Sequence, residues 1–118
     1  MFRTMLKSKL HRARVTEANL EYMGSLTVDR DLMDAVGMVP NEQVHVANLA
    51  NGERFVTYLF EGERGSGVMC VNGAAAHKAT EGDRIIVMAY GQYDESEIAG
   101  HRPKVAILSE DNRIVEML

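Results

Sequence analysis

Residues 43–60 read QVHVANLANGERFVTYLF, and this stretch carries the pattern that decides the fold. Polar and apolar residues alternate from Gln43 to Leu49, with two valines on one face, as in a half-buried strand. A second run of apolar and β-branched residues extends from Arg54 to Phe60. Between the runs stands Asn51-Gly52, a strong signal for a type I′ turn. The stretch therefore predicts a β-hairpin.

The rest of the chain shows mostly strand patterns. A helix is predicted after Asp29, whose side chain can cap it, and Gly37 is placed to end it. Further strands are predicted at residues 4–16, 68–71, 84–90, 104–108 and 113–117, one or two helical turns at 74–77, and a polar loop around 94–100. Many short strands favour a mainly β chain, a small β-barrel with one or two short helices, because closure removes unprotected sheet edges.

Length and composition indicate a single globular domain. The chain has 118 residues, of which 46% are hydrophobic and 25% are charged. No apolar run is long enough for a membrane span, and the N-terminal residues lack the apolar core of a secretory signal. Cys70 is the only cysteine, and the four histidines show no metal-ligand spacing. We therefore expect a cytoplasmic protein without a disulfide, a metal site or a membrane partner.

The charge is distributed unevenly along the chain. There are 13 Lys and Arg against 17 Asp and Glu, but residues 1–14 hold five cations and no acid. A basic arm on an acidic body is compatible with a small β-barrel module that binds nucleic acid, and this is the alternative function. An aromatic content of 6% without any Trp weighs against a base-stacking surface.

Two Gly-Ser dipeptides, Gly24-Ser25 and Gly65-Ser66, are candidates for chemistry. The ordinary role of such a pair is a β-turn. The other role is self-processing, in which the serine hydroxyl attacks the preceding carbonyl and forms an ester. Elimination of that ester leaves dehydroalanine, which hydrolyses to a pyruvoyl group whose ketone forms a Schiff base with an amine substrate. The dipeptides alone do not decide between these roles, or between the two pairs.

The residues around the first pair resemble a known family. The shared motifs are RTMLKSKLHR at 3–12, EYMGS at 21–25, NGERFVTY at 51–58, ERGS at 63–66, VNGAAAH at 71–77, GD at 82–83 and RP at 102–103. In this combination and order, the chain resembles the pyruvoyl-dependent aspartate decarboxylases over nearly its whole length. The resemblance implies a double-ψ β-barrel, a topology that hydrophobic spacing does not specify.

The resemblance also implies self-cleavage between Gly24 and Ser25. The single domain of residues 1–118 would then mature into a β chain, 1–24, and an α chain, 25–118. Ser25 would become a covalently bound pyruvoyl group, with no metal and no pyridoxal phosphate. The sequence leaves open whether a maturation factor assists the cleavage.

Further site residues follow from the same resemblance. Tyr58 matches the proton donor of the family. Thr57 matches a residue that acts in substrate binding and in self-cleavage, where its hydroxyl would donate to the oxyanion. Gly73, Ala74 and Ala75 match a substrate-contacting turn, whose small side chains expose backbone N–H groups to a carboxylate.

Basic and orienting residues complete the expected pocket. Lys9 and Arg54 match basic residues of the family site and suit the two carboxylates of L-aspartate. His11, Tyr22 and Asn72 are expected to line the pocket or orient its groups. Structural roles stay open for these three: Tyr22 in the core, Asn72 in a turn, and His11 on a strand surface.

The implied activity is decarboxylation of L-aspartate to β-alanine and CO2, a step toward pantothenate and coenzyme A. The implied assembly is a homotetramer with sites between subunits. Such sharing suits a domain too small to wall off a site alone.

Overall fold

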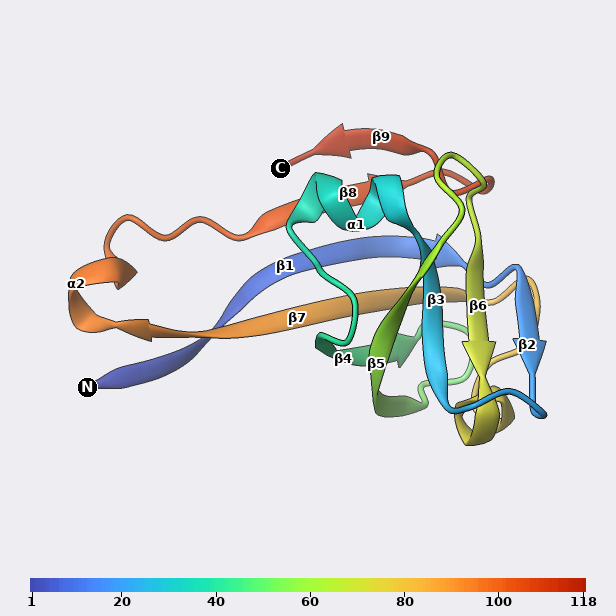
Figure 1. Cartoon of the computed structure of the whole chain (residues 1–118). Helices are drawn as coiled ribbons and strands as arrows, with labels where there is room; N and C mark the ends of the chain where they lie inside the picture. The colour runs from blue at the N-terminus through green and yellow to red at the C-terminus, as the bar shows by residue number, and fades with distance from the viewer.

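The computed structural model describes residues 1–118 and is mainly β (Figure 1). Its strands are β1 (Phe2–Arg14), β2 (Glu17–Asn19), β3 (Ser25–Asp29), β4 (Gln43–Asn48), β5 (Arg54–Gly62), β6 (Met69–Asn72), β7 (Arg84–Asp94), β8 (Lys104–Leu108) and β9 (Ile114–Met117). Its helices are α1 (Arg30–Val36), the 3-10 helix η1 (Gly73–His77) and α2 (Glu95–Ile98). None of them is long and apolar enough to cross a membrane. The prediction of a mainly β chain with one or two short α-helices is confirmed.

The strands form one sheet in the order β2-β6-β3-β5-β4-β7-β1-β8-β9. Most neighbours are antiparallel, but the pairs β1–β8, β2–β6 and β3–β5 are parallel. Parallel neighbours cannot be joined by a tight turn, so these pairs bring together segments that are distant in sequence. The arrangement is consistent with a small β-barrel, and the double-ψ topology stays a prediction.

The predicted hairpin forms between β4 and β5, but its turn is not the predicted one. A type I′ turn needs a positive φ at both central residues, whereas Gly52 has φ +75° and Asn51 has no positive φ. The Asn48 side chain accepts a hydrogen bond from the Ala50 amide (2.9 Å), which holds the chain in a longer loop. The prediction of a type I′ turn was therefore wrong.

β1 and β7 form the longest ladder of the sheet. Its register runs from Phe2 opposite Asp94 to Arg14 opposite Arg84. In Figure 1 the start of β1 and the end of β7 run out together to the left, beyond the other strands, and α2 follows. The loop prediction at 94–100 was wrong because Asp94 caps α2, with its side chain accepting from the Ser96 amide.

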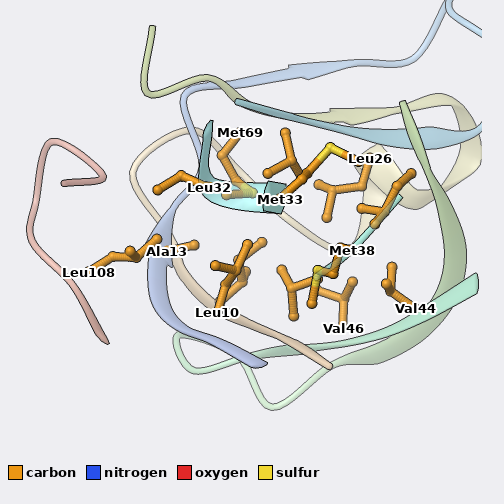
Figure 2. Packing of buried hydrophobic residues seen from close by; sticks show 14 of the residues in the cluster. Leu10, Ala13, Leu26, Leu32, Met33, Met38, Val44, Val46, Met69 and Leu108 are labelled. Atoms are coloured by element: carbon orange, nitrogen blue, oxygen red, sulfur yellow. The ribbon is translucent and has the colours of Figure 1, made fainter. Parts of the chain in front are cut away.

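Helix α1 forms as predicted and packs against the core. The Asp29 carboxylate accepts a hydrogen bond from the Asp31 amide (2.8 Å), and Gly37, with φ +72°, ends the helix. Figure 2 shows side chains from the strands and the helix filling one interior, among them Leu10, Ala13, Leu26, Leu32, Met33, Met38, Val44, Val46, Met69 and Leu108. This single core fixes the strands whose outer faces carry the site.

Candidate active site around Ser25

Ser25 is the first residue of β3 and lies on the face of the sheet that points away from the core. It precedes the core residue Leu26, and side chains alternate between faces along a strand. Its relative exposure is nevertheless 0%. Asn72 of β6 is its cross-strand partner. On the other side, Leu26 pairs with Leu59 of β5, which puts Tyr58 next to Ser25. Asn72, Ser25 and Tyr58, three predicted site residues, therefore lie side by side on the neighbouring strands β6, β3 and β5.

Asn72 connects the hydroxyl groups of this face. Its Nδ2 donates to Ser25 Oγ (3.1 Å) and to Thr27 Oγ1 (3.1 Å). The Ser25 hydroxyl in turn donates to the carbonyl oxygen of Met23 (3.2 Å). On its acceptor side, Asn72 Oδ1 lies 3.1 Å from Cys70 Sγ. The Ser25 oxygen is therefore held by one donated and one accepted hydrogen bond.

Gly24 packs directly on Gly73, the first residue of η1. A Cβ at position 73 would lie 2.6 Å from both the Cα and the nitrogen of Gly24, and 3.0 Å from the carbonyl oxygen of Tyr22. Gly73 also has φ +68°, a conformation that glycine adopts without strain. Only glycine fits between η1 and the predicted cleavage site. Tyr22 itself is 62% exposed, which excludes the alternative that it packs in the core.

The two alanines after Gly73 differ in exposure. Ala74 is exposed, whereas Ala75 is partly buried and packs against the hydrophobic core. Because η1 begins at Gly73, beside Gly24, its start lies next to the predicted cleavage site. The structure thus groups the predicted Gly73 turn with Gly24 and Ser25.

Tyr58 and Thr57 lie on opposite faces of β5. The Tyr58 ring packs edge-on against Phe60, with ring centroids 5.6 Å apart, on the face that also carries Ser25. Thr57 alternates to the side of Leu59, a core residue. The Thr57 hydroxyl forms no hydrogen bond with Gly24 or Ser25, so its predicted oxyanion role stays a prediction.

Lys9 and His11 share the outer face of β1, on either side of the buried Leu10. Lys9 forms no ion pair, and the buried Nδ1 of His11 has no hydrogen-bond partner. The pKa of His11 lies below its ordinary value, first because burial disfavours the charged ring and then because Lys9 and Arg12 repel it. His11 is therefore a neutral imidazole at neutral pH.

Arg54 lies on the same outer face but is distant from Lys9 and His11. Cross-strand pairing runs from His11 through Ile86 and Ala47 to Arg54, which is three strand steps, or about 14 Å. Along β5, Arg54 is also about 13 Å from Tyr58. It is exposed and forms no ion pair. A single chain thus does not gather Lys9, Arg54 and Ser25 into one pocket.

A cavity of about 430 Å³ lies farther along this outer surface. Its lining residues are Thr4, Gln43, His45, Tyr90, Gly91 and Gln92. None of them was predicted as a site residue. The cavity comes nearest to the Ser25 site at Gln43, the cross-strand neighbour of Tyr58.

The residues around Ser25 fit a group made from the serine itself. The side chain is fully buried, Asn72 already donates to its oxygen, and two glycines without side chains meet beside it. The structure contains no group of three or more His, Cys, Asp or Glu side chains placed to hold a metal ion.

Part of the basic arm is neutralised within the chain. Arg3 pairs with Glu95 (3.3 Å), and Lys7 pairs with Glu42. These contacts leave fewer free cations for the phosphates of a nucleic acid than the sequence alone indicated.

Two residues of the Ser25 network were missed by sequence reasoning. Thr27 accepts a hydrogen bond from Asn72, and Cys70 contacts the oxygen of the same amide. Their positions two residues from Ser25 and Asn72 put them on the same strand faces, so period-two alternation was the signal that could have found them.

The fold and this site define a small β protein with a buried serine directly after an exposed glycine. The sequence matches the model of the aspartate decarboxylase family over residues 1–115. It is 59% identical to an aspartate 1-decarboxylase of Geobacillus sp. (strain WCH70), 60% to one of Halalkalibacterium halodurans and 56% to one of Bacillus subtilis (strain 168). Each alignment covers 100% of this chain and 93% of the relative. The chain belongs to the aspartate decarboxylase family and is an enzyme.

Proposed function

We propose that the chain decarboxylates L-aspartate to β-alanine and CO2 with a pyruvoyl group made from its own Ser25. Membership of the aspartate decarboxylase family supports the reaction. The observation that carries the self-cleavage is the position of Ser25, fully buried and hydrogen-bonded to Asn72 directly after an exposed glycine.

The cleavage proceeds without an external oxidant or reductant. Ser25 Oγ attacks the carbonyl carbon of Gly24, the peptide C–N bond breaks, and the hydroxyl proton ends on the Ser25 nitrogen. The resulting ester loses the Cα proton of Ser25, its Cβ–Oγ bond breaks, and Gly24 leaves as a carboxylate. Water then replaces the nitrogen of the dehydroalanine, ammonia is released, and a ketone remains at position 25.

The contacts of Ser25 support this chemistry. Oγ leaves with Gly24 as a carboxylate oxygen, and Asn72 Nδ2 lies 3.1 Å from it in the uncleaved chain. A donor aimed at an oxygen that gains negative charge stabilises the transition state. Gly24 lacks a side chain, so the peptide can bend toward the attacking hydroxyl.

In the mature enzyme, the pyruvoyl ketone supplies the electron withdrawal that loss of CO2 requires. Tyr58, beside position 25, holds the proton that replaces the lost carboxyl group. Thr57, whose side chain lies on the core side of β5 in the uncleaved chain, would have to turn toward position 25 to contact substrate. The backbone N–H groups of Gly73, Ala74 and Ala75 bind a substrate carboxylate.

Lys9 and Arg54 bind the anionic substrate across a subunit boundary. Both are cations without an acidic partner, and one chain keeps them far from Ser25. A homotetramer would lay the outer face of one subunit against that of the next, so that Lys9 of one copy completes the pocket of its neighbour. His11 and Tyr22 line the same boundary.

The test is the intact mass of the purified protein and of a Ser25→Ala variant. We expect two chains, residues 1–24 and residues 25–118, the second lighter by one ammonia than a chain that begins with serine. Ser25→Ala should give one folded, uncut and inactive chain. Ser66→Ala is the matched control, because Ser66 donates to the Glu63 carbonyl in a distant loop, and it should cleave normally.

Two results would contradict the proposal. One is an uncut wild-type chain that decarboxylates aspartate. The other is turnover in the Ser25→Ala variant.

A further inference from the structure

Cys70 lies against the amide that holds the Ser25 hydroxyl. Its Sγ is 3.1 Å from Asn72 Oδ1 and 3.5 Å from Glu17 Oε2, and the residue is 5% exposed. The thiol carries one proton and can donate to only one of these oxygens at a time. The shorter contact is the one to Asn72.

The thiol is in the form that can donate. Burial, followed by the nearby Glu17 carboxylate and its negative charge, raises the pKa of Cys70 to about 11. At neutral pH the sulfur therefore keeps its proton. It is thus a poor nucleophile and is suited to a hydrogen-bonding role.

The orientation of the Asn72 amide depends on this donor. An asparagine side chain has an oxygen end that accepts and a nitrogen end that donates, and its flip is set by its neighbours. With Cys70 donating to Oδ1, both Nδ2 protons point to the hydroxyl oxygens of Ser25 and Thr27. Without a donor at position 70, the flipped amide is no longer disfavoured, because both hydroxyls can donate to its oxygen instead.

We propose that Cys70 is a positioning residue for self-cleavage: its thiol fixes Asn72 as a donor to Ser25 Oγ. The inference rests on the proposed self-cleavage and adds a residue to it. In the flipped arrangement, an amide oxygen would face Ser25 Oγ and repel the negative charge that this oxygen gains as Gly24 leaves. Cys70 acts through Asn72 and touches no reacting atom.

The experiment follows cleavage of newly made precursor over time. Wild-type chain and variants are synthesised in a cell-free system, and the uncut fraction is measured by gel and intact mass. Cys70→Ala removes the donor and should slow cleavage about tenfold, the effect of losing roughly one hydrogen bond from the transition state. Cys70→Ser restores a donor of similar size and should cleave at close to the wild-type rate.

Val71→Ala is the matched control for a general loss of stability. Val71 is 0% exposed and lies between Cys70 and Asn72, but its side chain faces the core. It should lower the melting temperature more than Cys70→Ala does and leave the cleavage rate of the folded precursor unchanged. A rate that followed the melting temperature across all three variants would overturn the positioning role.

The outcomes separate this inference from the proposed function. If wild-type precursor never cleaves, both fail. If wild-type and Cys70→Ala precursors cleave at the same rate, only the role of Cys70 fails. If Cys70→Ser is as slow as Cys70→Ala, the thiol does not act as a replaceable donor, and the inference also fails.

Discussion

The site around Ser25 and the outer face of β1 around Lys9 differ in how many of their polar groups have partners within one chain. At the Ser25 site, Ser25 and Asn72 are buried and every polar atom of their side chains has a partner. On β1, Lys9 has no acidic partner and the buried Nδ1 of His11 has no hydrogen-bond partner. The polar groups around Ser25 are thus satisfied within one chain, whereas Lys9 and His11 on the open outer face of β1 lack partners.

The difference separates two tasks. The proposed self-cleavage involves groups close to one peptide bond, and Ser25, Gly24 and Asn72 meet within a single chain. Recognition of a dianionic substrate needs cations, and the free ones lie away from Ser25: Lys9 is on β1, four strands across the sheet, and Arg54 is about 13 Å along the neighbouring strand β5. We infer that a chain matures by itself but binds substrate together with its neighbours. The two regions should therefore respond differently to substitution.

The largest effect is expected for Gly73→Ala, because it places a methyl group against Gly24, beside Ser25. A Cβ at this position would lie 2.6 Å from Gly24, and the positive φ adds about 1–2 kcal/mol of strain. Cleavage should stop or become barely detectable by intact mass. Gly52→Ala is the control, because Gly52 has φ +75° and open space around it, so it carries the strain without the collision. Equal cleavage in the two variants would refute the role of the close contact.

A smaller effect is expected from removing charge on the open surface. Lys9→Met and Arg54→Met should each raise the KM for aspartate about tenfold to a hundredfold, the worth of one charge-assisted hydrogen bond. Both should still cleave at the wild-type rate. Lys104→Met is the control on the neighbouring strand β8 and should leave KM unchanged. Loss of cleavage in the Lys9→Met variant would contradict the inference that the outer face of β1 serves substrate binding and not self-cleavage.

The smallest effect concerns His11 and pH. Its pKa is lower in the folded chain than in the unfolded one, so the unfolded chain binds more protons just below the ordinary histidine pKa of about 6.5. Folding stability should therefore fall as the pH drops through that value. His11→Gln should flatten this part of the melting-temperature profile. An unchanged profile would show that His11 is not desolvated on the open face.

Local signals in the sequence predicted most of the elements, but not β2 or β3, the strand that begins at Ser25. Asp29 caps the start of α1 and Gly37 ends it, as expected, and the run around Asn51-Gly52 forms a hairpin. The turn type failed because the Asn48 side chain reorganised the loop, and α2 was missed although Asp94 and Glu97 form a capping box.

The assembly of the site could not be predicted from local patterns. Tyr58 comes beside Ser25 only through the parallel pairing of β3 with β5, which joins distant segments. The contact of Gly24 with Gly73 likewise depends on η1 following β6. The motif resemblance named these residues, but the pairing register explains why they meet. It also separates Lys9 and Arg54 from them within one chain.

The place of β1 in the sheet has a consequence for the cut protein. This strand lies between β7 and β8, and its ladder with β7 runs from Phe2 to Arg14. After cleavage behind Gly24, β1 would belong to a separate peptide with no covalent tie to the rest. The peptide also contributes Leu10 and Ala13 to the core. Its release would therefore be the same event as unfolding, and the mature enzyme would behave as a complemented pair of fragments, interdependent in folding although severed in sequence.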